Sequence, residues 1–327
     1  MTIDSDHRPA EGVGNALDVH ARVQAAVDGV RRRESGLAVA LSLDGETSIV
    51  LDAGRDLLTD HTLFEIGSVT KTMTALVLAG AAVGGELTLD TTVGDVLGLA
   101  AHQVAPITLV QLATHTSGLP RLAPNHVTAG DDPADPYARF DEERLLEALA
   151  DVAPAAEPTE YSNFGFQILG HVLKEVLATP LGQLFQERIF DPLGMTDSRS
   201  GTSVEGGQQL PGYGLEGVVP FWGHRLAGAG GVASSIADLA RYVTAMYAPP
   251  DDEFGRAVEL AMSLHGSGAR RRIGLAWIQE RGLWCHGGGT AGFSCFAAVH
   301  RPSRAGVALA MNSGGPMGSS VHAQGVR

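Results

Sequence analysis

The sequence predicts an α+β fold, in which strands from both ends of the chain form one antiparallel sheet with helices packed on it. A mostly helical domain is inserted between the two groups of strands. Apolar runs typical of strands occur near the start and again near the end of the 327-residue chain, whereas helical periodicity dominates its middle. The regular alternation of strands and helices that builds a parallel sheet is missing.

The N-terminal part of the chain is expected to begin with a tail and a helix. Residues 1–15 are polar and predict a disordered tail, and apolar positions at helical spacing follow from Ala16 to Arg33. Two apolar runs then flank Asp44-Gly45, a dipeptide that favours the tight turn of a β-hairpin. This hairpin supplies the first strands of the sheet.

The middle of the chain predicts five helices separated by loops rich in Gly, Pro and Asp. They span Ser68–Val83, Thr108–Thr114, Glu142–Leu149, Gly165–Leu177 and Ser235–Met246. The longest loop, Leu119–Phe140, is of a length that is uncommon unless a loop shapes a site. We expect it to wall a pocket together with segment 200–226, which contains Tyr213, Phe221 and Trp222, although both could be ordinary surface loops.

Four apolar runs near the end of the chain predict an antiparallel meander, because only short Gly or Pro turns join them. Their sequences are RRIGLAWIQ, GLWCHGG, FSCFAAVHR and AGVALAMNS. The expected organisation is therefore a sheet domain formed by 16–67 and 230–313, a mainly helical domain at 68–229 and an irregular tail at 314–327.

Composition narrows the class of protein. The formal net charge of −14 favours solubility and argues against a nucleic-acid partner, whose phosphates need a basic face. The polar N-terminus does not resemble a secretory signal, and no apolar stretch reaches the ~18 residues that a membrane helix needs. A cytoplasmic location is therefore expected. Cys285 and Cys295 could face each other across a hairpin, but a reduced pair is the expected state there.

The stretch LFEIGSVTKTMTALVLA offers a candidate nucleophile. It places Ser68 three residues before Lys71, so a helix would carry both on one face. A lysine activates a serine hydroxyl only if burial and nearby cations lower its pKa from ~10.4, and the apolar surroundings favour such burial. The first turn of the helix would also offer backbone N–H groups to an oxyanion. The structural alternative is a helix-capping serine followed by a surface lysine.

Two further motifs follow Ser68 and Lys71 along the chain. Tyr161-Ser162-Asn163 directly precedes a predicted helix, and His286-Gly287-Gly288 lies between two predicted strands. The order Ser-x-x-Lys, Tyr-x-Asn, His-x-Gly resembles that of the serine β-lactamase and penicillin-binding-protein superfamily. A leading tyrosine in the second motif and histidine in the third are similar to class C β-lactamases and family VIII carboxylesterases.

The resemblance covers roughly residues 20–313. ITLVQLATHTSGLP at 107–120, IFDPLGMTDS at 189–198 and AGAGGVASSIADLARYV at 227–243 also look like segments of this superfamily. One departure is the end of the chain, because these proteins usually close with a long helix against the sheet. Here GGPMGSSVHAQGVR lacks helical periodicity, so the closing helix is expected to be missing, replaced or lost.

The resemblance implies three catalytic residues. Ser68 would be the nucleophile, Lys71 its general base, and Tyr161 a proton shuttle between the leaving group and the incoming acceptor. The phenol of Tyr161 could act in this way only if the adjacent lysine stabilises the phenolate. Read without the resemblance, Tyr161 could equally be a core tyrosine.

The resemblance also implies residues that bind the substrate. Asn163 would hydrogen-bond Lys71 and the acyl chain, and His286 would occupy the place of the third-motif cation or donor. The backbone N–H groups of Ser68 and Gly289 would form an oxyanion hole, and Gly288 would let the substrate approach the strand closely. The structural alternatives are an N-cap role for Asn163 and a strand position for His286.

Several functions remain open. We expect a serine hydrolase, foremost an esterase or amidase acting on a small acyl compound, because His286 stands where relatives have lysine. The alternatives are an acyltransferase, a β-lactamase or D-alanyl-D-alanine carboxypeptidase, and a ligand-binding protein without activity. No cofactor and no metal are expected, because no His-Glu-x-x-His is present and Cys285 and His286 point to opposite faces of a strand. The expected partner is a small acyl substrate, and the oligomeric state stays open.

Overall fold

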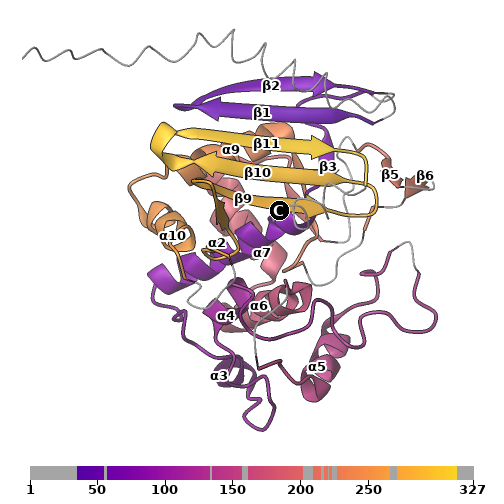
Figure 1. Ribbon diagram of the computed structural model, residues 1–327, viewed down its shortest axis with the longest axis vertical. Helices are drawn as coiled ribbons and strands as arrows, with labels where there is room; N and C mark the ends of the chain where they lie inside the picture. The colour runs from indigo at the N-terminus through magenta and orange to yellow at the C-terminus, as the bar shows by residue number, and fades with distance from the viewer. Residues whose placement is uncertain are drawn as a thin grey trace, which may run out of the picture.

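Six strands form one antiparallel sheet in the computed structural model (Figure 1). The structure describes residues 35–54, 57–132, 135–156, 161–201, 209–214, 217–219, 221–222, 227–265 and 271–314. Across the sheet the strands are β2 (Glu46–Asp52), β1 (Leu37–Leu43), β11 (Ala305–Met311), β10 (Ser294–His300), β9 (Leu283–Gly289) and β8 (Ile278–Glu280). The α+β fold is confirmed, because β11 from the chain's end pairs with β1 from its beginning.

The Asp-Gly hairpin is confirmed. Leu43 pairs with Glu46, which leaves Asp44 and Gly45 as a two-residue loop. Both loop residues have positive φ, 50° and 90°, as a primed turn requires, and such a turn follows the right-handed twist of the strands. Local sequence therefore sets the register of the sheet's first edge.

All five predicted helices are present, with ends shifted by a few residues. They are α2 (Thr70–Val83), α4 (Leu109–Ala113), α5 (Glu142–Asp151), α6 (Asn163–Val176) and α9 (Ile236–Tyr247). The sequence analysis did not predict α3 (Val93–Leu97), α7 (Leu181–Phe185), the π-helical turn Gln186–Phe190, α8 (Asp191–Leu193), α10 (Glu253–Ala261) or the 3-10 turns Gly67–Val69 (η1) and Arg301–Ser303 (η3). Most of these are too short to give a periodic signal.

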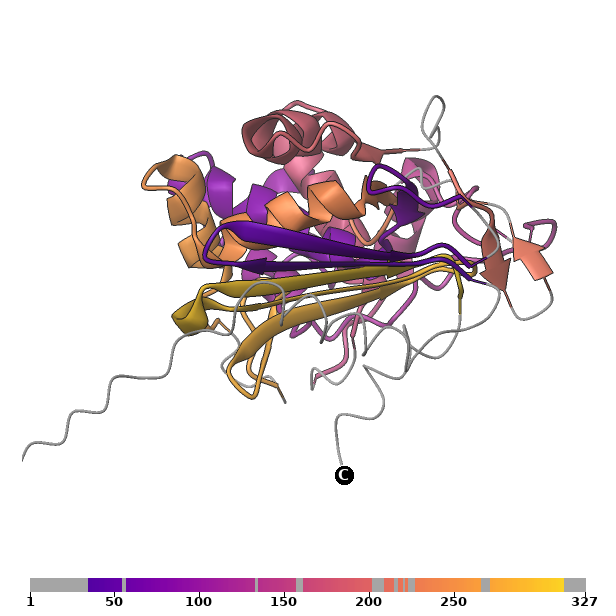
Figure 2. The ribbon, with the colours of Figure 1, turned by 90° about the horizontal axis from the view of Figure 1, so that it is seen from above.

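Helix α9 covers one face of the sheet, where it contacts β1, β10 and β11 (Figure 2). Small residues on that face let the helix approach, among them Ala38, Ala40 and Ala308, all fully buried. A hydrogen bond of 2.7 Å between Ser42 Oγ and Tyr247 Oη ties the helix to β1. On the opposite face, Leu37, Val39, Val50 and Met311 form a second buried cluster.

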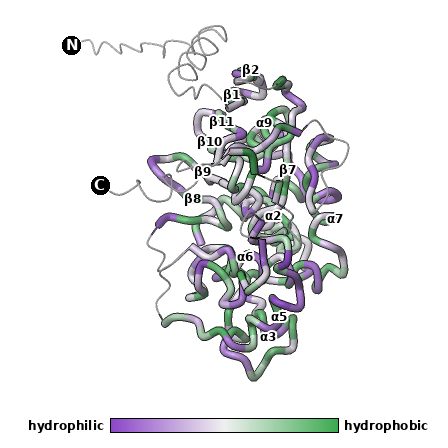
Figure 3. Tube along the Cα trace, turned by 90° about the vertical axis from the view of Figure 1, so that its right-hand side faces the viewer, coloured by the Kyte–Doolittle hydropathy of each residue, from purple (hydrophilic) through white to green (hydrophobic). Residues whose placement is uncertain are grey.

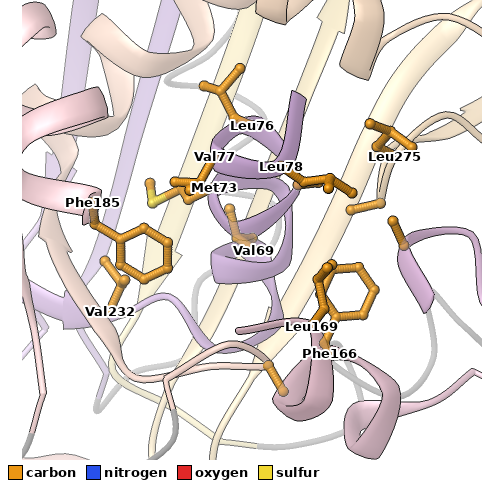
Figure 4. Close-up of a cluster of buried hydrophobic side chains, with 14 of the residues drawn as sticks. Val69, Met73, Leu76, Val77, Leu78, Phe166, Leu169, Phe185, Val232 and Leu275 are labelled. Carbon is orange, nitrogen blue, oxygen red and sulfur yellow. The ribbon is translucent and has the colours of Figure 1, made fainter. Parts of the chain in front are cut away.

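Helix α2 lies in the centre of the main hydrophobic core and is covered on several sides. Figure 4 shows Met73 and Val77 beside Phe185, while Leu78 lies near Leu275 on the other side. In Figure 3, hydrophobic residues run through the region between the labelled strands and α9. A helix packed on all sides holds its side chains in fixed positions. This matters because α2 directly follows η1, the turn that contains the candidate nucleophile.

Two strand predictions need correction. Of the predicted strand at 271–279, only the end is in the sheet, as part of β8; residue Ile273 makes one isolated bridge to Ile278. The second correction is β7 (Val232–Ser235), which the sequence analysis did not predict and which lies directly before α9. Strand β7 pairs with β3 (Leu63–Glu65) and β4 (Arg199–Ser200), and a separate hairpin joins β5 (Gly212–Gly214) to β6 (Gly217–Val219).

The two cysteines do not face each other. Cys285 lies opposite Ala298 and Cys295 opposite Gly288, so the register excludes a cross-strand disulfide, and both thiols are free. The predicted helix at 16–33 and the question of a closing helix after residue 314 lie outside the described residues. Within the described ranges, no helix is long and apolar enough to cross a membrane. The predicted domain boundaries stay a prediction.

Candidate active site

Ser68 and Lys71 lie at the junction of η1 and α2. Ser68 is the middle residue of the 3-10 turn η1, and Lys71 belongs to the first turn of α2. Lys71 Nζ donates a hydrogen bond to Ser68 Oγ at 3.0 Å. The structure therefore brings together the two residues that the Ser-x-x-Lys spacing predicts, although the helix begins two residues later than expected.

Lys71 is fully buried, and its second hydrogen bond goes to the carbonyl oxygen of Ala229 at 2.6 Å. Among the described residues, no carboxylate forms an ion pair with it. Burial holds the pKa of the Lys71 ammonium well below its usual range, and the positive charge of Arg121 lowers it further. A lysine in this environment loses its proton far more easily than one in water.

The backbone of β9 packs directly against η1. A Cβ on Gly288 would lie 1.9 Å from the carbonyl oxygen of Ile66 and 3.0 Å from the amide nitrogen of Ser68. A Cβ on Gly67 would lie 2.6 Å from the amide nitrogen of Gly289. Only glycines permit this approach, and it brings the two predicted oxyanion-hole nitrogens, those of Ser68 and Gly289, to the same junction.

Tyr161 lies just before α6, where Ser162 is the N-cap. Ser162 Oγ accepts a hydrogen bond from the N–H of Gly165 at 2.8 Å, so the serine, and not Asn163, caps the helix. This cap holds Tyr161 next to Lys71, whose Nζ lies 5.0 Å from the centroid of the tyrosine ring.

Opposing influences act on the Tyr161 phenol. Burial raises its pKa, while the neighbouring Ser68 hydroxyl and the positive charge of Arg121 act in the opposite direction. The Arg121 guanidinium carbon lies 5.4 Å from the centroid of the tyrosine ring. The phenol is therefore protonated at neutral pH and is available as a hydrogen-bond donor.

Asn163 departs from the expected contact with Lys71. It is the first residue of α6, and its Nδ2 donates to Tyr137 Oη at 3.1 Å. Its Oδ1 is buried and has no hydrogen-bond partner within the described part of the chain. The amide oxygen is therefore available to a hydrogen-bond donor from a ligand, while the lysine is held by Ser68 and Ala229.

His286 is buried on β9, and its ring centroid lies 6.2 Å from that of Tyr161. Its Nδ1 is 2.8 Å from the carbonyl oxygen of Gly287, which can only accept, so Nδ1 carries a proton. The fold thus brings Ser68, Lys71, Tyr161 and His286 together from separate parts of the sequence, with Asn163 beside Tyr161.

The sequence analysis missed His115, which supports the tyrosine motif. His115 Nδ1 accepts a hydrogen bond from the N–H of Ser162 at 3.1 Å, and its ring lies 4.3 Å from that of Tyr161, centroid to centroid. Its φ of 57° is uncommon for a residue with a side chain. His115 belongs to ITLVQLATHTSGLP, which the sequence analysis noted as similar to the superfamily. Nothing in the local sequence showed that this histidine contacts Tyr161.

Residues of the Leu119–Phe140 loop and of segment 200–226 lie beside Asn163, and that these loops wall an acyl pocket stays a prediction. Tyr137 and Trp222 come from these two segments, and their ring centroids are 5.2 Å apart. Phe221 packs edge-on against Phe293 at 5.3 Å. Tyr213 instead lies in the β5–β6 hairpin, where its N–H donates to the carbonyl oxygen of Asn312.

Glu65 connects this wall to β9. Its Oε1 accepts a hydrogen bond from the N–H of Trp222 and its Oε2 one from Thr290 Oγ1, both at 2.6 Å. Burial raises the pKa of Glu65 to about 7, although both hydrogen bonds lower it. The sequence analysis gave no role to Glu65, which appears there only as a residue of the stretch LFEIGSVTKTMTALVLA.

One group of side chains has metal-ligand chemistry. Glu142, His171 and Glu175 offer ligand atoms that lie within 4.8 Å of one another. Lys174 Nζ already lies 2.6 Å from the Glu142 carboxylate and 3.3 Å from that of Glu175, so an ammonium compensates their charge. The group is separate from Ser68 and gives no evidence of a cofactor in the candidate active site.

Comparisons with known proteins show the family. The family model described as "Beta-lactamase" matches residues 19–326. The chain is 29% identical over 277 residues to a β-lactamase of Escherichia coli (strain K12), an alignment that covers 79% of this chain and 69% of that protein. It is 33% identical over 195 residues to penicillin-binding protein 4 of Amycolatopsis lactamdurans, over 55% of this chain and about half (49%) of that protein.

A solved structure shows the same fold. The D-alanine carboxypeptidase AmpC from Burkholderia cenocepacia superposes with a TM-score of 0.77 at 24% identity, covering 94% of this chain and 98% of that one. At this identity the likeness establishes the architecture, while substrate and products depend on the residues of the site.

Proposed function

Since the chain belongs to the beta-lactamase family of serine hydrolases, we propose that it is an esterase or amidase that hydrolyses a small acyl compound through an acyl-enzyme on Ser68. One observation carries the proposal: a fully buried Lys71, without a described carboxylate partner, donates a hydrogen bond to Ser68 Oγ at 3.0 Å. Such a lysine is the kind of base that a serine nucleophile needs.

The first half of the reaction follows from this contact. The neutral amine of Lys71 accepts the proton of Ser68 Oγ while that oxygen bonds to the carbonyl carbon of the substrate. The N–H groups of Ser68 and Gly289, whose nitrogens lie at the same junction, would donate to the oxygen on which negative charge develops. The proton then passes from Lys71 through Tyr161 to the leaving group as the bond to that group breaks, and an acyl-enzyme remains.

The second half reverses these roles. Water gives a proton to the Tyr161–Lys71 pair as its oxygen attacks the acyl carbon. Ser68 Oγ recovers the proton when its bond to that carbon breaks. The closeness of Lys71 Nζ to the Tyr161 ring, 5.0 Å from its centroid, supports a proton path that the two residues share.

His286 favours an ester or amide without the recognition elements of a β-lactam. Histidine is a weaker cation than lysine near neutral pH, so it holds a substrate carboxylate less firmly at this position. Its Nδ1 is already engaged by the Gly287 carbonyl oxygen at 2.8 Å.

Three other functions are the alternatives. An acyltransferase would use the same acyl-enzyme and pass the acyl group to an amine or alcohol in place of water. A β-lactamase or D-alanyl-D-alanine carboxypeptidase would correspond to what the named relatives are. A binding protein would use the pocket without turnover, but it would not need a lysine buried against Ser68.

Labelling of the nucleophile tests the proposal. Purified protein is treated with a fluorophosphonate and its intact mass is measured, beside the variant Ser68→Ala. The control is Ser303→Ala, which changes an exposed serine of η3, the turn between β10 and β11. We expect one adduct on the wild type and on the control, and none on Ser68→Ala. An adduct that persists on Ser68→Ala would contradict the proposal.

Product analysis then separates the alternatives. Short-chain activated esters, a chromogenic cephalosporin and a D-alanyl-D-alanine peptide are each offered with and without an added amine. Ester hydrolysis with little aminolysis is the expected result. Dominant aminolysis would favour the acyltransferase, and preferred turnover of the cephalosporin or the peptide would favour the relatives' activities.

A further inference from the structure

We propose that Arg121 forms an anion-binding subsite that selects substrates carrying a carboxylate. The inference rests on the proposed hydrolase function and names a class of substrate for the same site: esters or amides with a free carboxylate in the acyl part or in the leaving group. The sequence analysis gave no role to Arg121, which lies in the loop that follows α4.

The backbone of Arg121 is fixed beside the catalytic residues. Its carbonyl oxygen accepts hydrogen bonds from the N–H groups of Asn163 and Phe164, at 2.9 and 3.2 Å. These are N–H groups at the start of α6, which have no partner within the helix. The residue is therefore anchored to the helix that carries the tyrosine motif, although its side chain is exposed.

The guanidinium lies over the ring of Tyr161, with Cζ 5.4 Å from the ring centroid. Lys71 Nζ is 5.0 Å from the same centroid, so both cations lie next to the Tyr161 ring. The positive charge of Arg121 is also felt in the site, since it lowers the pKa values of Lys71, Tyr161 and Tyr137.

Arg121 has no carboxylate partner among the described residues, although the chain carries a net charge of −14. Six other arginines form ion pairs with Asp or Glu: Arg139, Arg144, Arg188, Arg241, Arg301 and Arg304. An arginine that stays unpaired on an acidic protein, at the edge of the site, is available to an anion from solution.

The chemistry of the two cations explains why Arg121 suits this role. Lys71 must give up its charge to act as a base, whereas a guanidinium keeps its charge at every working pH. Its planar fork also matches the two oxygens of a carboxylate. Arg121 thus supplies a positive charge beside Tyr161 that does not depend on His286.

Matched substrate pairs test the subsite. The first pair is p-nitrophenyl butyrate and mono-p-nitrophenyl glutarate, in which the carboxylate is on the acyl part. The second is phenyl butyrate and 4-butyryloxybenzoate, in which it is on the leaving group. We expect kcat/KM to favour the anionic member of at least one pair by about tenfold, and the pair that shows it identifies the charged half of the substrate.

Variants assign this preference to Arg121. Arg121→Gln should reduce the anionic-to-neutral ratio of kcat/KM about tenfold, and Arg121→Lys should give an intermediate ratio because it keeps a point charge. Arg139→Gln is the matched control, since Arg139 is an exposed arginine of the same loop that bonds Gly130 and Asp131, and it should keep the wild-type ratio. Thermal unfolding checks that the variants are folded.

The outcomes separate this proposal from the proposed function. The same ratio is measured as the rate of Ser68 labelling by neutral and carboxylate-bearing fluorophosphonates, which does not depend on the acceptor. Labelling without preference for the carboxylate, or an equal loss for both probes in Arg121→Gln, overturns the subsite alone. If neither probe labels Ser68, the proposed hydrolase function fails, and the subsite with it.

Discussion

The two sides of the candidate active site are built in different ways. On one side, β9 lies against η1 through backbone atoms, and Gly67 and Gly288 leave no room for a side chain. On the other side, the Leu119–Phe140 loop and the start of α6 present side chains, among them Arg121, Tyr137 and Asn163. In the proposed mechanism, the first side positions the nucleophile and the oxyanion nitrogens, and the second would contact the rest of the substrate.

This difference separates the chemistry from the selectivity. A contact between two backbones tolerates almost no substitution, so it would preserve the geometry that the proposed acyl transfer requires. Side chains on a loop can change without moving the nucleophile, so they set which acyl compound fits. Four variants test this division, from the largest expected effect to the smallest.

Gly288→Ala should have the largest effect. The new Cβ would lie 1.9 Å from the Ile66 carbonyl oxygen, so β9 or η1 must move. We expect kcat/KM to fall by about 10²-fold or more, because an oxyanion donor is displaced, and the free energy of unfolding to fall by about 3 kcal/mol. Steady-state kinetics and urea unfolding measure both.

Gly80→Ala is the matched control for that variant. A Cβ at Gly80, within α2, would meet nothing within 4 Å. It should keep the activity and slightly increase stability, since alanine favours a helix by about 1 kcal/mol over glycine. Full activity in Gly288→Ala would show that the backbone contact does not position the site.

Glu65→Gln tests the link between the two sides, because Glu65 binds both Trp222 and Thr290. Its pKa is raised from 4.5 to about 7 by burial, so the folded state binds the proton more tightly than the unfolded state. This tighter proton binding contributes to the free energy of unfolding. The contribution is fully present below pH 4.5 and is lost as the pH rises through about 7. The wild type should lose up to about 3 kcal/mol over this range relative to the variant.

The measurement is urea unfolding of both proteins from pH 4.5 to 8. Glu143→Gln, at an exposed position of α5, is the control and should follow the wild type at every pH. A constant difference between wild type and Glu65→Gln would show that Glu65 does not titrate with a raised pKa.

His115→Ala should have a smaller effect, on the side-chain wall. It removes the acceptor of the Ser162 N–H, and a buried donor left without a partner costs about 2 kcal/mol. We expect kcat to fall about tenfold because Tyr161 loses the ring that holds it. Stopped-flow acylation and thermal unfolding report the two losses.

His115→Asn is the rescue variant for this position. Asparagine tolerates the positive φ of 57° and offers an oxygen acceptor, so it should recover part of the stability. Equal stability and kcat in the alanine and asparagine variants would argue against the hydrogen bond as the cause.

Tyr137→Phe should have the smallest effect. It removes only the hydroxyl that accepts from Asn163 Nδ2 at 3.1 Å, which is worth about 1 kcal/mol. Since Tyr137 belongs to the side-chain wall of the site, we expect KM to rise a few-fold. The rate of Ser68 labelling by a small neutral fluorophosphonate should stay within about twofold of the wild-type rate, because the net contribution of one hydrogen bond is small. A large fall in that rate would place Tyr137 among the residues that activate Ser68.

Much of the fold was readable from local patterns. The Asp44-Gly45 hairpin, the five helices and most of the C-terminal meander follow from turn chemistry and periodicity, and they were placed within a few residues. Elements shorter than two helical turns, such as α3 and α7, escaped because so few residues give no period. Strand β7 was missed because its pairing partners, β3 and β4, are distant in the sequence.

The sequence by itself identified the candidate residues of the chemistry. Ser68 and Lys71 lie three residues apart on one turn, so their contact is local, and the Tyr161 and His286 motifs could be identified by their order along the chain. The family match over residues 19–326 agrees with that order.

Tertiary structure alone decided how these residues are surrounded. The low pKa of Lys71 arises from full burial under segments that include Ala229, and the approach of Gly288 to Ile66 joins two distant strands and turns. His115 beneath Tyr161 and Arg121 over its ring are contacts of the same kind. Burial and electrostatic environment depend on which distant segments pack together, and local sequence patterns do not contain that information.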